Sequence, residues 1–128
     1  MKRIIIWLAV ATFVMAPSIN AQSKAMNTTD GLASACRLYA SLTDKTPGTS
    51  DSDKYMQAGF CMGYMAGFAH AASLASAPDL CMPESINLSE VVKAFLKYVD
   101  AHPEELQLSA KVTVPHALKM AFPCKTRQ

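Results

Sequence analysis

Apolar positions recur at the spacing of one helical face in several stretches of the chain. The first stretch runs from about residue 29 to residue 42, and its apolar face is made of Leu32, Ala35, Cys36, Tyr39 and Leu42. Thr29 or Asp30, both of them residue types that cap helix N-termini well, stands just before that face. The pattern therefore predicts a first helix that packs one side against a core.

Residues 52–76 predict a second helix of unusual composition. No Lys, Arg, Asp or Glu occurs from residue 58 to residue 78, and a helix that is apolar on every side is typical of the middle of a structure. Gly59, Gly63 and Gly67 recur every four residues, so one ridge of the helix has almost no side chains. Each interior glycine costs about 1 kcal/mol of helix propensity, which close packing of another helix on the ridge can offset. We expect these glycines to form a helix-packing ridge. The favoured partner is another helix of the same chain, in which case a large residue at Gly63 would overpack the contact. The alternative partner is the same helix of a second copy.

Two further helices are predicted in the C-terminal half. Asn87 precedes Glu90 by three residues, which is the spacing of a capping box, and the next fourteen or so residues have a regular apolar face. Pro103, followed by two acidic residues, is expected to begin the fourth helix, which ends before Pro123. Pro115 removes one hydrogen bond inside that helix and is expected to kink it.

These elements predict an all-α fold, a small four-helix up-down bundle with two disulfides. An even number of cysteines in a small exported chain is typical of a disulfide framework, and the four are Cys36, Cys61, Cys81 and Cys124. In an up-down bundle Cys36 and Cys61 lie at similar height on the first two helices. Cys81 follows the far end of the second helix, and the fourth helix returns to that end at Cys124. We therefore expect the pairs Cys36–Cys61 and Cys81–Cys124.

The N-terminal residues predict a cleavable secretory signal. Lys2 and Arg3 precede thirteen uncharged and mostly apolar residues, and Ala21 is a small residue suited to the position before a peptidase cut. A membrane-spanning helix needs roughly 20 apolar residues, so this stretch is short for an anchor. We expect export to the periplasm, cleavage after Ala21 and no membrane association afterwards. The remaining residues, 22–128, are expected to form a single helical domain.

Charge and candidate chemistry argue against several functions. Without Lys2 and Arg3 the chain has ten basic and ten acidic residues, whereas nucleic-acid binding needs an excess of basic ones. The chain has no C-x-x-C pair, and its histidines, His70, His102 and His116, stand far apart, so we expect no metal, haem or redox site. It also lacks the G-x-S-x-G motif of many serine hydrolases. We therefore expect no catalytic residue, no cofactor and no enzymatic activity.

Four motifs that occur in order along the chain resemble a known family. They are Phe60-Cys61-Met62-Gly63-Tyr64-Met65-Ala66-Gly67, Cys81-Met82-Pro83, His102-Pro103-Glu104 and Ala121-Phe122-Pro123-Cys124. Together they resemble the Rap/Tai family of immunity proteins over roughly residues 36–124. Members of this family are small periplasmic helical proteins that protect a bacterium from peptidoglycan amidases delivered by type VI secretion.

The resemblance implies a function in binding rather than in catalysis. It implies a periplasmic immunity protein that inhibits a cognate secreted cell-wall amidase, and a homodimer that occludes the active-site cleft of that enzyme. A small periplasmic chaperone or envelope-stress protein of similar helical fold, without a toxin partner, is the alternative. The motifs do not assign partner-binding residues. The two longest loops, residues 43–53 and 76–85, are the candidates because loops on a disulfide-linked scaffold commonly carry recognition.

Overall fold

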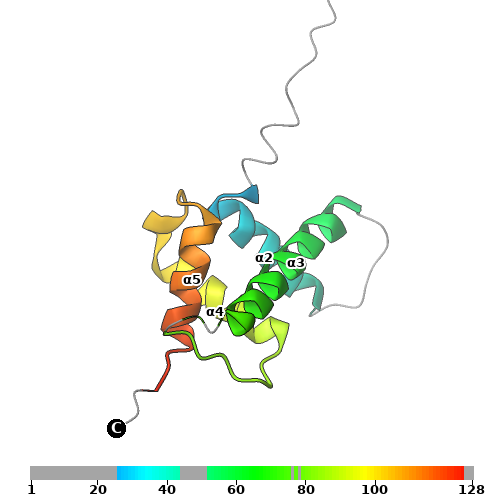
Figure 1. The fold of residues 1–128 in the computed structure, drawn as a ribbon. Helices are drawn as coiled ribbons and strands as arrows, with labels where there is room; N and C mark the ends of the chain where they lie inside the picture. The colour runs from blue at the N-terminus through cyan, green and yellow to red at the C-terminus, as the bar shows by residue number, and fades with distance from the viewer. Residues whose placement is uncertain (1–25, 44–51, 76, 78, 126–128) are drawn as a thin grey trace, which may run out of the picture.

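The computed structural model describes residues 26–43, 52–75, 77 and 79–125, and this part of the chain is helical (Figure 1). Its elements in order are α2 (Thr29–Thr43), α3 (Ser52–Leu74), α4 (Leu88–Ala101), the 3-10 turn η1 (Pro103–Glu105) and α5 (Ala110–Ala121). The predicted all-α fold with four helices is confirmed. The predicted secretory signal lies outside the described residues.

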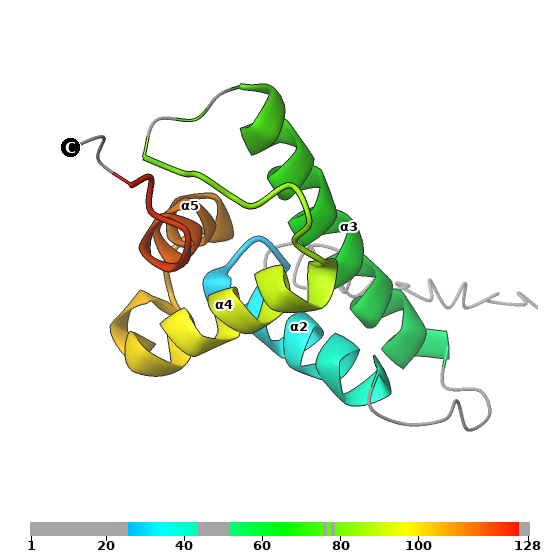
Figure 2. The same ribbon diagram turned by 90° about the horizontal axis from the view of Figure 1, so that it is seen from below.

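Helices α2 and α4 form the central pair of the bundle. Each of them packs against the other and against both α3 and α5. Seen from below, α3 and α5 lie on opposite sides of this pair (Figure 2). The largest completely buried side chains come from all four helices and are Phe95, Leu32, Met65 and Leu118. The core therefore lies around α2 and α4, and the two flanking helices each cover one side of it.

Helix α4 begins at the predicted capping box. The Asn87 side chain accepts a hydrogen bond from the Glu90 backbone N–H at 3.0 Å, and the Glu90 side chain accepts one from the Asn87 N–H at 3.2 Å. Two N–H groups that a helix N-terminus leaves unpaired are thereby satisfied. The buried residues of α4 lie on one face and are Val91, Val92, Phe95 and Val99.

The prediction that the fourth helix begins at Pro103 is wrong, because residues from Pro103 form only one 3-10 turn and α5 begins at Ala110. The backbone between Glu105 and Ala110 instead accepts hydrogen bonds from the N-terminus of α2. The Thr29 N–H donates to the Leu108 carbonyl at 2.8 Å, and the Asp30 N–H donates to the Leu106 carbonyl at 2.9 Å. These carbonyls satisfy the first N–H groups of α2 and point toward that helix. Residues 106–109 consequently leave the helical path.

A buried threonine pair reinforces this junction between α2 and α5. The Thr29 hydroxyl donates to the Leu108 carbonyl at 3.1 Å and lies 2.9 Å from the hydroxyl oxygen of Thr113. Both threonines are completely buried. Because a buried hydroxyl without a partner is costly, the contact with Thr29 stabilises Thr113 in this position.

Both predicted disulfides are present. Cys36–Cys61 joins α2 to α3 inside the core, where both cysteines are completely buried. Cys81–Cys124 joins the segment after α3 to the segment after α5, beside a hydrogen bond from the Cys81 N–H to the Phe122 carbonyl at 2.9 Å. The first disulfide therefore attaches α3 to α2, and the second joins two segments that lie outside the helices.

Burial makes the shorter disulfide the more important one for stability. The cross-links span 25 and 43 residues, for which loop entropy gives about 3.5 and 4 kcal/mol. Replacing Cys36 and Cys61 by alanine also removes buried sulfurs, at about 1 kcal/mol each. We expect this double variant to lose more unfolding free energy in urea than the Cys81→Ala/Cys124→Ala variant. The opposite ranking would contradict the burial argument.

Candidate functional site

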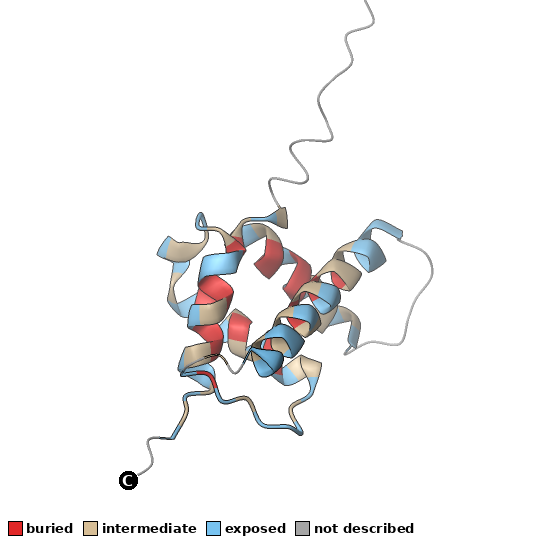
Figure 3. Cartoon of the chain, in the orientation of Figure 1, coloured by how far each residue is buried: buried red, intermediate tan, exposed pale blue. Residues whose placement is uncertain are grey.

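Helix α3 packs on the bundle through one side only. Its buried residues are Ala58, Cys61 and Met65, which are spaced along a single face. The side of α3 that faces the viewer in Figure 3 is mostly exposed or intermediate. The expectation that this uncharged helix lies in the middle of the structure is therefore wrong. Because α2 and α4 already occupy the centre, α3 has core neighbours on one side alone.

The glycine ridge lies on the uncovered part of α3. A Cβ placed at Gly59, Gly63 or Gly67 meets no atom within 4 Å in the part of the chain that the structure describes. Gly63 and Gly67 are exposed, and Gly59 is partly exposed. The expected packing of the ridge within the chain, and the overpacking expected at Gly63, are therefore wrong for the described residues. Packing against a second copy stays a prediction.

Large apolar side chains accompany the ridge. Met56 is 55% exposed, Met62 is 48% exposed and Leu74 is 88% exposed. We call these residues, together with the three glycines, the outer face of α3. Exposed apolar side chains that gather on one element mark a candidate binding surface, and here they share a helix with the uncovered glycines.

A groove between α4, α5 and the segment before α4 forms a second candidate surface, with a cavity volume of about 860 Å³. Its apolar lining includes Ile86, Ala94, Ala117 and Phe122, and the 73% exposed Met120 stands at its side. We call it the α4–α5 groove. The sequence pattern does not predict this groove, because it exists only where two helices and a loop meet. Met120 was a sequence signal, because it is a large apolar residue outside the apolar face of the last helix.

Two lysines line the same groove. Lys93 and Lys97 are exposed, and neither forms an ion pair with a described residue. The carboxylate that lines the groove beside them, Glu90, is already bonded to the Asn87 N–H of the capping box. This bond leaves the negative charge of Glu90 in place, so the two lysines and Glu90 give the lining of the α4–α5 groove a net positive charge.

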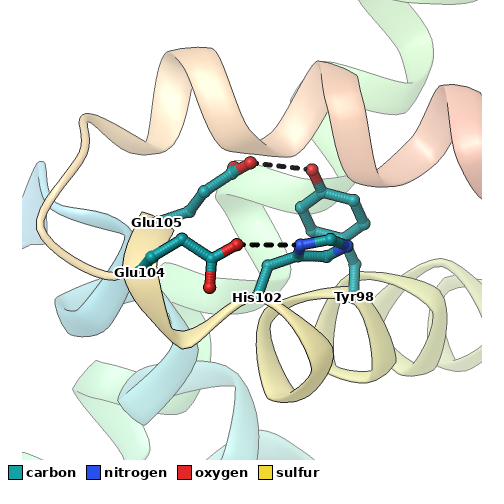
Figure 4. Close-up of polar contacts among 4 residues, drawn as sticks. All are labelled: Tyr98, His102, Glu104 and Glu105. Carbon is teal, nitrogen blue, oxygen red and sulfur yellow. Dashed lines mark hydrogen bonds and ion pairs between the residues drawn. The ribbon is translucent and has the colours of Figure 1, made fainter.

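Two residues that line the groove, Tyr98 and His102, lie beside the carboxylates of Glu105 and Glu104 (Figure 4). The rings of Tyr98 and His102 lie 4.4 Å apart between centroids. The Tyr98 hydroxyl donates to Glu105 Oε1 at 2.9 Å, and His102 Nδ1 lies 3.1 Å from Glu104 Oε1. The second carboxylate oxygen of Glu105 is buried and has no hydrogen-bond partner among the described residues. The hydroxyl of Tyr98 is thus the contact that holds the Glu105 carboxylate.

The environment of this cluster shifts two pKa values. Burial raises the pKa of Tyr98, and the hydrogen bond to Glu105 and the negative charges of Glu105 and Glu104 raise it further. A backbone hydrogen bond lowers the pKa of Glu104, and the hydrogen bond and charge of His102 lower it further. The neutral phenol and the ionised Glu104 are therefore the forms that the fold favours.

Another groove, separate from the α4–α5 groove, lies between the C-terminal half of α3 and the segment before α4, and its volume is about 580 Å³. His70, Leu80, Met82 and Ile86 are among its lining residues. One of the two loops expected to carry recognition, residues 76–85, thus contributes to both grooves through its described part. Most of the other loop, residues 44–51, lies outside the described residues.

The described residues form no group of three or more His, Cys, Asp or Glu side chains that could hold a metal ion. No helix among them has the length and apolar character needed to cross a membrane. The candidate surfaces of the described residues are the outer face of α3, the α4–α5 groove and the groove lined by His70.

The comparisons with known proteins identify the family. The family model of the Rap1a immunity proteins matches residues 28–124. The chain belongs to the Rap1a immunity protein family. This confirms the resemblance found in the sequence motifs. No curated protein and no solved structure matches the chain.

The Rap1a match coincides with the structural unit. It begins at Thr28, which pairs with Ser109 in an isolated β-bridge beside the junction of α2 and α5. It ends at Cys124, the last cysteine of the second disulfide. Both candidate surfaces therefore lie inside the region that defines the family.

The Tyr98 hydrogen bond gives a pH-dependent prediction. Tyr98→Phe leaves the Glu105 carboxylate without its donor and is expected to lower the unfolding free energy at neutral pH by about 1 kcal/mol. A group whose pKa is raised by folding contributes stability that is present below its unfolded pKa, here about 10, and that is lost as the pH rises. The difference between wild type and variant is therefore expected to shrink above that pH.

Urea unfolding of both proteins at neutral pH and at a pH above 10 measures this effect. The pKa of Tyr64 is also raised by burial, but Tyr64 is present in both proteins and cancels in the difference. A stability difference that stays constant across this pH range would show that the Tyr98 contact does not operate as described.

Proposed function

We propose that this Rap1a family protein is a periplasmic immunity protein that binds and inhibits a peptidoglycan amidase delivered by type VI secretion. The observation that carries the proposal is the family match, which extends across the whole disulfide-linked helical unit. Immunity proteins act by binding a partner effector. The outer face of α3 and the α4–α5 groove offer surfaces for such binding.

Two features support the periplasm as its location. Lys2, Arg3 and the apolar stretch after them have the order of a cleavable secretory signal. All four cysteines are paired in the structure, and such disulfides persist in oxidising compartments such as the bacterial periplasm. The periplasm is also where an amidase would meet peptidoglycan.

The amidase target is supported by the four ordered motifs that resemble the Rap/Tai immunity proteins. An inhibitor of this kind covers the active-site cleft of the effector. It needs a rigid shape more than it needs reactive groups, because a preorganised surface loses little entropy on binding. The two disulfides and the buried junction of α2 with α5 provide such rigidity.

We also propose that the chain forms a homodimer through the outer face of α3. Glycines repeated every four residues let two helix backbones approach closely. Residues 58 to 78 have no formal charge, so two copies of this segment would bring no like charges together. The exposed Met56 and Met62 can fill the remaining space because methionine side chains adapt to irregular gaps.

Cell protection tests the proposed function. An effector encoded beside this chain and exported to the periplasm of a Gram-negative host is expected to lyse the cells. Co-expression of the full chain is expected to restore growth, whereas a version lacking residues 1–21 is expected to fail. In vitro, an equimolar amount of the pure chain is expected to stop peptidoglycan cleavage by the effector.

Protection by the version without residues 1–21 would contradict the periplasmic location. Suppression of aggregation of unrelated proteins without effector binding would favour a chaperone.

Substitution of Gly63 tests the dimer. Gly63→Leu is expected to leave thermal unfolding of the monomer unimpaired, because no described atom lies within 4 Å of the new Cβ and leucine favours a helix more than glycine does. Sedimentation is expected to show loss of the dimer. Lys111→Leu places the same side chain at an exposed position of α5 and is the matched control. A Gly63→Leu protein that dimerises as wild type does would exclude the ridge from the interface.

A further inference from the structure

We infer that the α4–α5 groove receives an acidic segment of the effector, in which an apolar side chain enters the groove and flanking carboxylates meet Lys93 and Lys97. This inference rests on the proposed immunity function and assigns a binding surface to it. The occupant is a protein segment of defined chemistry, which is apolar at its centre and negatively charged beside it.

The rim of the groove carries two lysines that suit an acidic partner. Lys93 and Lys97 are four residues apart on α4 and therefore lie one helical turn from each other on the same side. Neither forms an ion pair with a described residue, whereas the cation of Arg37, also exposed, is held by Asp100 at 2.6 Å. A pair of unpartnered lysines beside a groove favours and steers an approaching group of carboxylates.

The other groups that face the groove offset this charge only in part. Glu90 lines the groove and brings one negative charge, and its hydrogen bond from the Asn87 N–H holds this carboxylate at the capping box. His102 lies at the far end, where its Nδ1 is 3.1 Å from Glu104. The rim consequently offers two free cations within one helical turn, and this spacing suits two carboxylates on one partner segment.

The shape of the groove suits an apolar side chain. Ala94 on α4 and Ala117 on α5 have small side chains, which leave a space of about 860 Å³ between the helices. Met120, 73% exposed, stands at the side of this space and can move against an incoming side chain. Protein interfaces commonly place an apolar anchor in such a pocket and surround it with polar contacts. The groove and its lysine rim have this arrangement.

Binding kinetics test the inference, with the effector that the wild-type chain neutralises as the probe. Lys93→Glu/Lys97→Glu is expected to lower the association rate about tenfold or more at low salt, and to remove most of its salt dependence. Ala94→Trp fills the groove and is expected to raise the dissociation rate about tenfold or more. Surface plasmon resonance at low and high salt measures both rates.

The control is Lys111→Glu/Lys125→Glu, which makes the same change in net charge at exposed lysines outside the groove lining. Thermal melting of each variant establishes that it is folded; Lys93 and Lys97 are exposed, so their variant provides the test even where Ala94→Trp does not fold. Equal rates for the groove variants and the control would overturn the groove assignment and leave the immunity function intact. Failure of the wild-type chain to bind or neutralise the effector would overturn both.

Discussion

The first N–H groups of α2 need acceptors, and the architecture depends on how the chain provides them. A helix leaves its first N–H groups without partners inside the helix, and here the carbonyls of Leu108 and Leu106 accept those of the completely buried Thr29 and of Asp30. The contact joins two segments that are nearly eighty residues apart in sequence, and the completely buried hydroxyls of Thr29 and Thr113 complete it. This junction holds α2 at the centre, ends the 3-10 turn and sets the start of α5. The position of α5 against α4, and with it the groove between them, follows.

The central pair of helices also explains why α3 is so exposed. With α2 and α4 packed together, α3 contributes only Ala58, Cys61 and Met65 as buried residues, and the buried Cys36–Cys61 disulfide fixes it in place. A covalent link at the centre of the contact allows the rest of the helix to present apolar residues to the outside. In an immunity protein this is a useful division, because the core stays rigid while the uncovered side of α3 is available for partners.

Local signals in the sequence predicted local structure well. The spacing of Asn87 and Glu90 defined the start of α4, and the four cysteines with the helix order gave both disulfides correctly. Pro103 was misleading, because proline favours the first turn of a helix but does not show where the following carbonyls must go. The backbone contacts of Leu106 and Leu108 with α2 are long-range, and no periodicity encodes them.

The candidate surfaces were less predictable than the fold. An uncharged helix with regular glycines is typical of both a buried helix and an exposed interface, and Gly63 has the same sequence context in either case. Only the packing of α2 against α4 decides between them. Lys93 and Lys97 were recognisable as exposed residues, but their place on the rim of a groove depends on the position of α5. Sequence patterns therefore give the faces of single helices, and the surfaces built from several helices need the structure.

Hydrogen–deuterium exchange of the chain, alone and bound to its effector, tests the central claim most directly. The claim is that a fixed frame of α2 and α4, joined to α5 at Thr29 and Thr113, presents its outer surfaces to a protein partner. Amides of residues 29–36 and 110–118 are expected to exchange slowly in both states, while effector binding slows exchange in residues 93–101 and 117–122. Rapid exchange at the α2–α5 junction in the free chain, or protection by the effector that spares α4 and α5, would contradict the account.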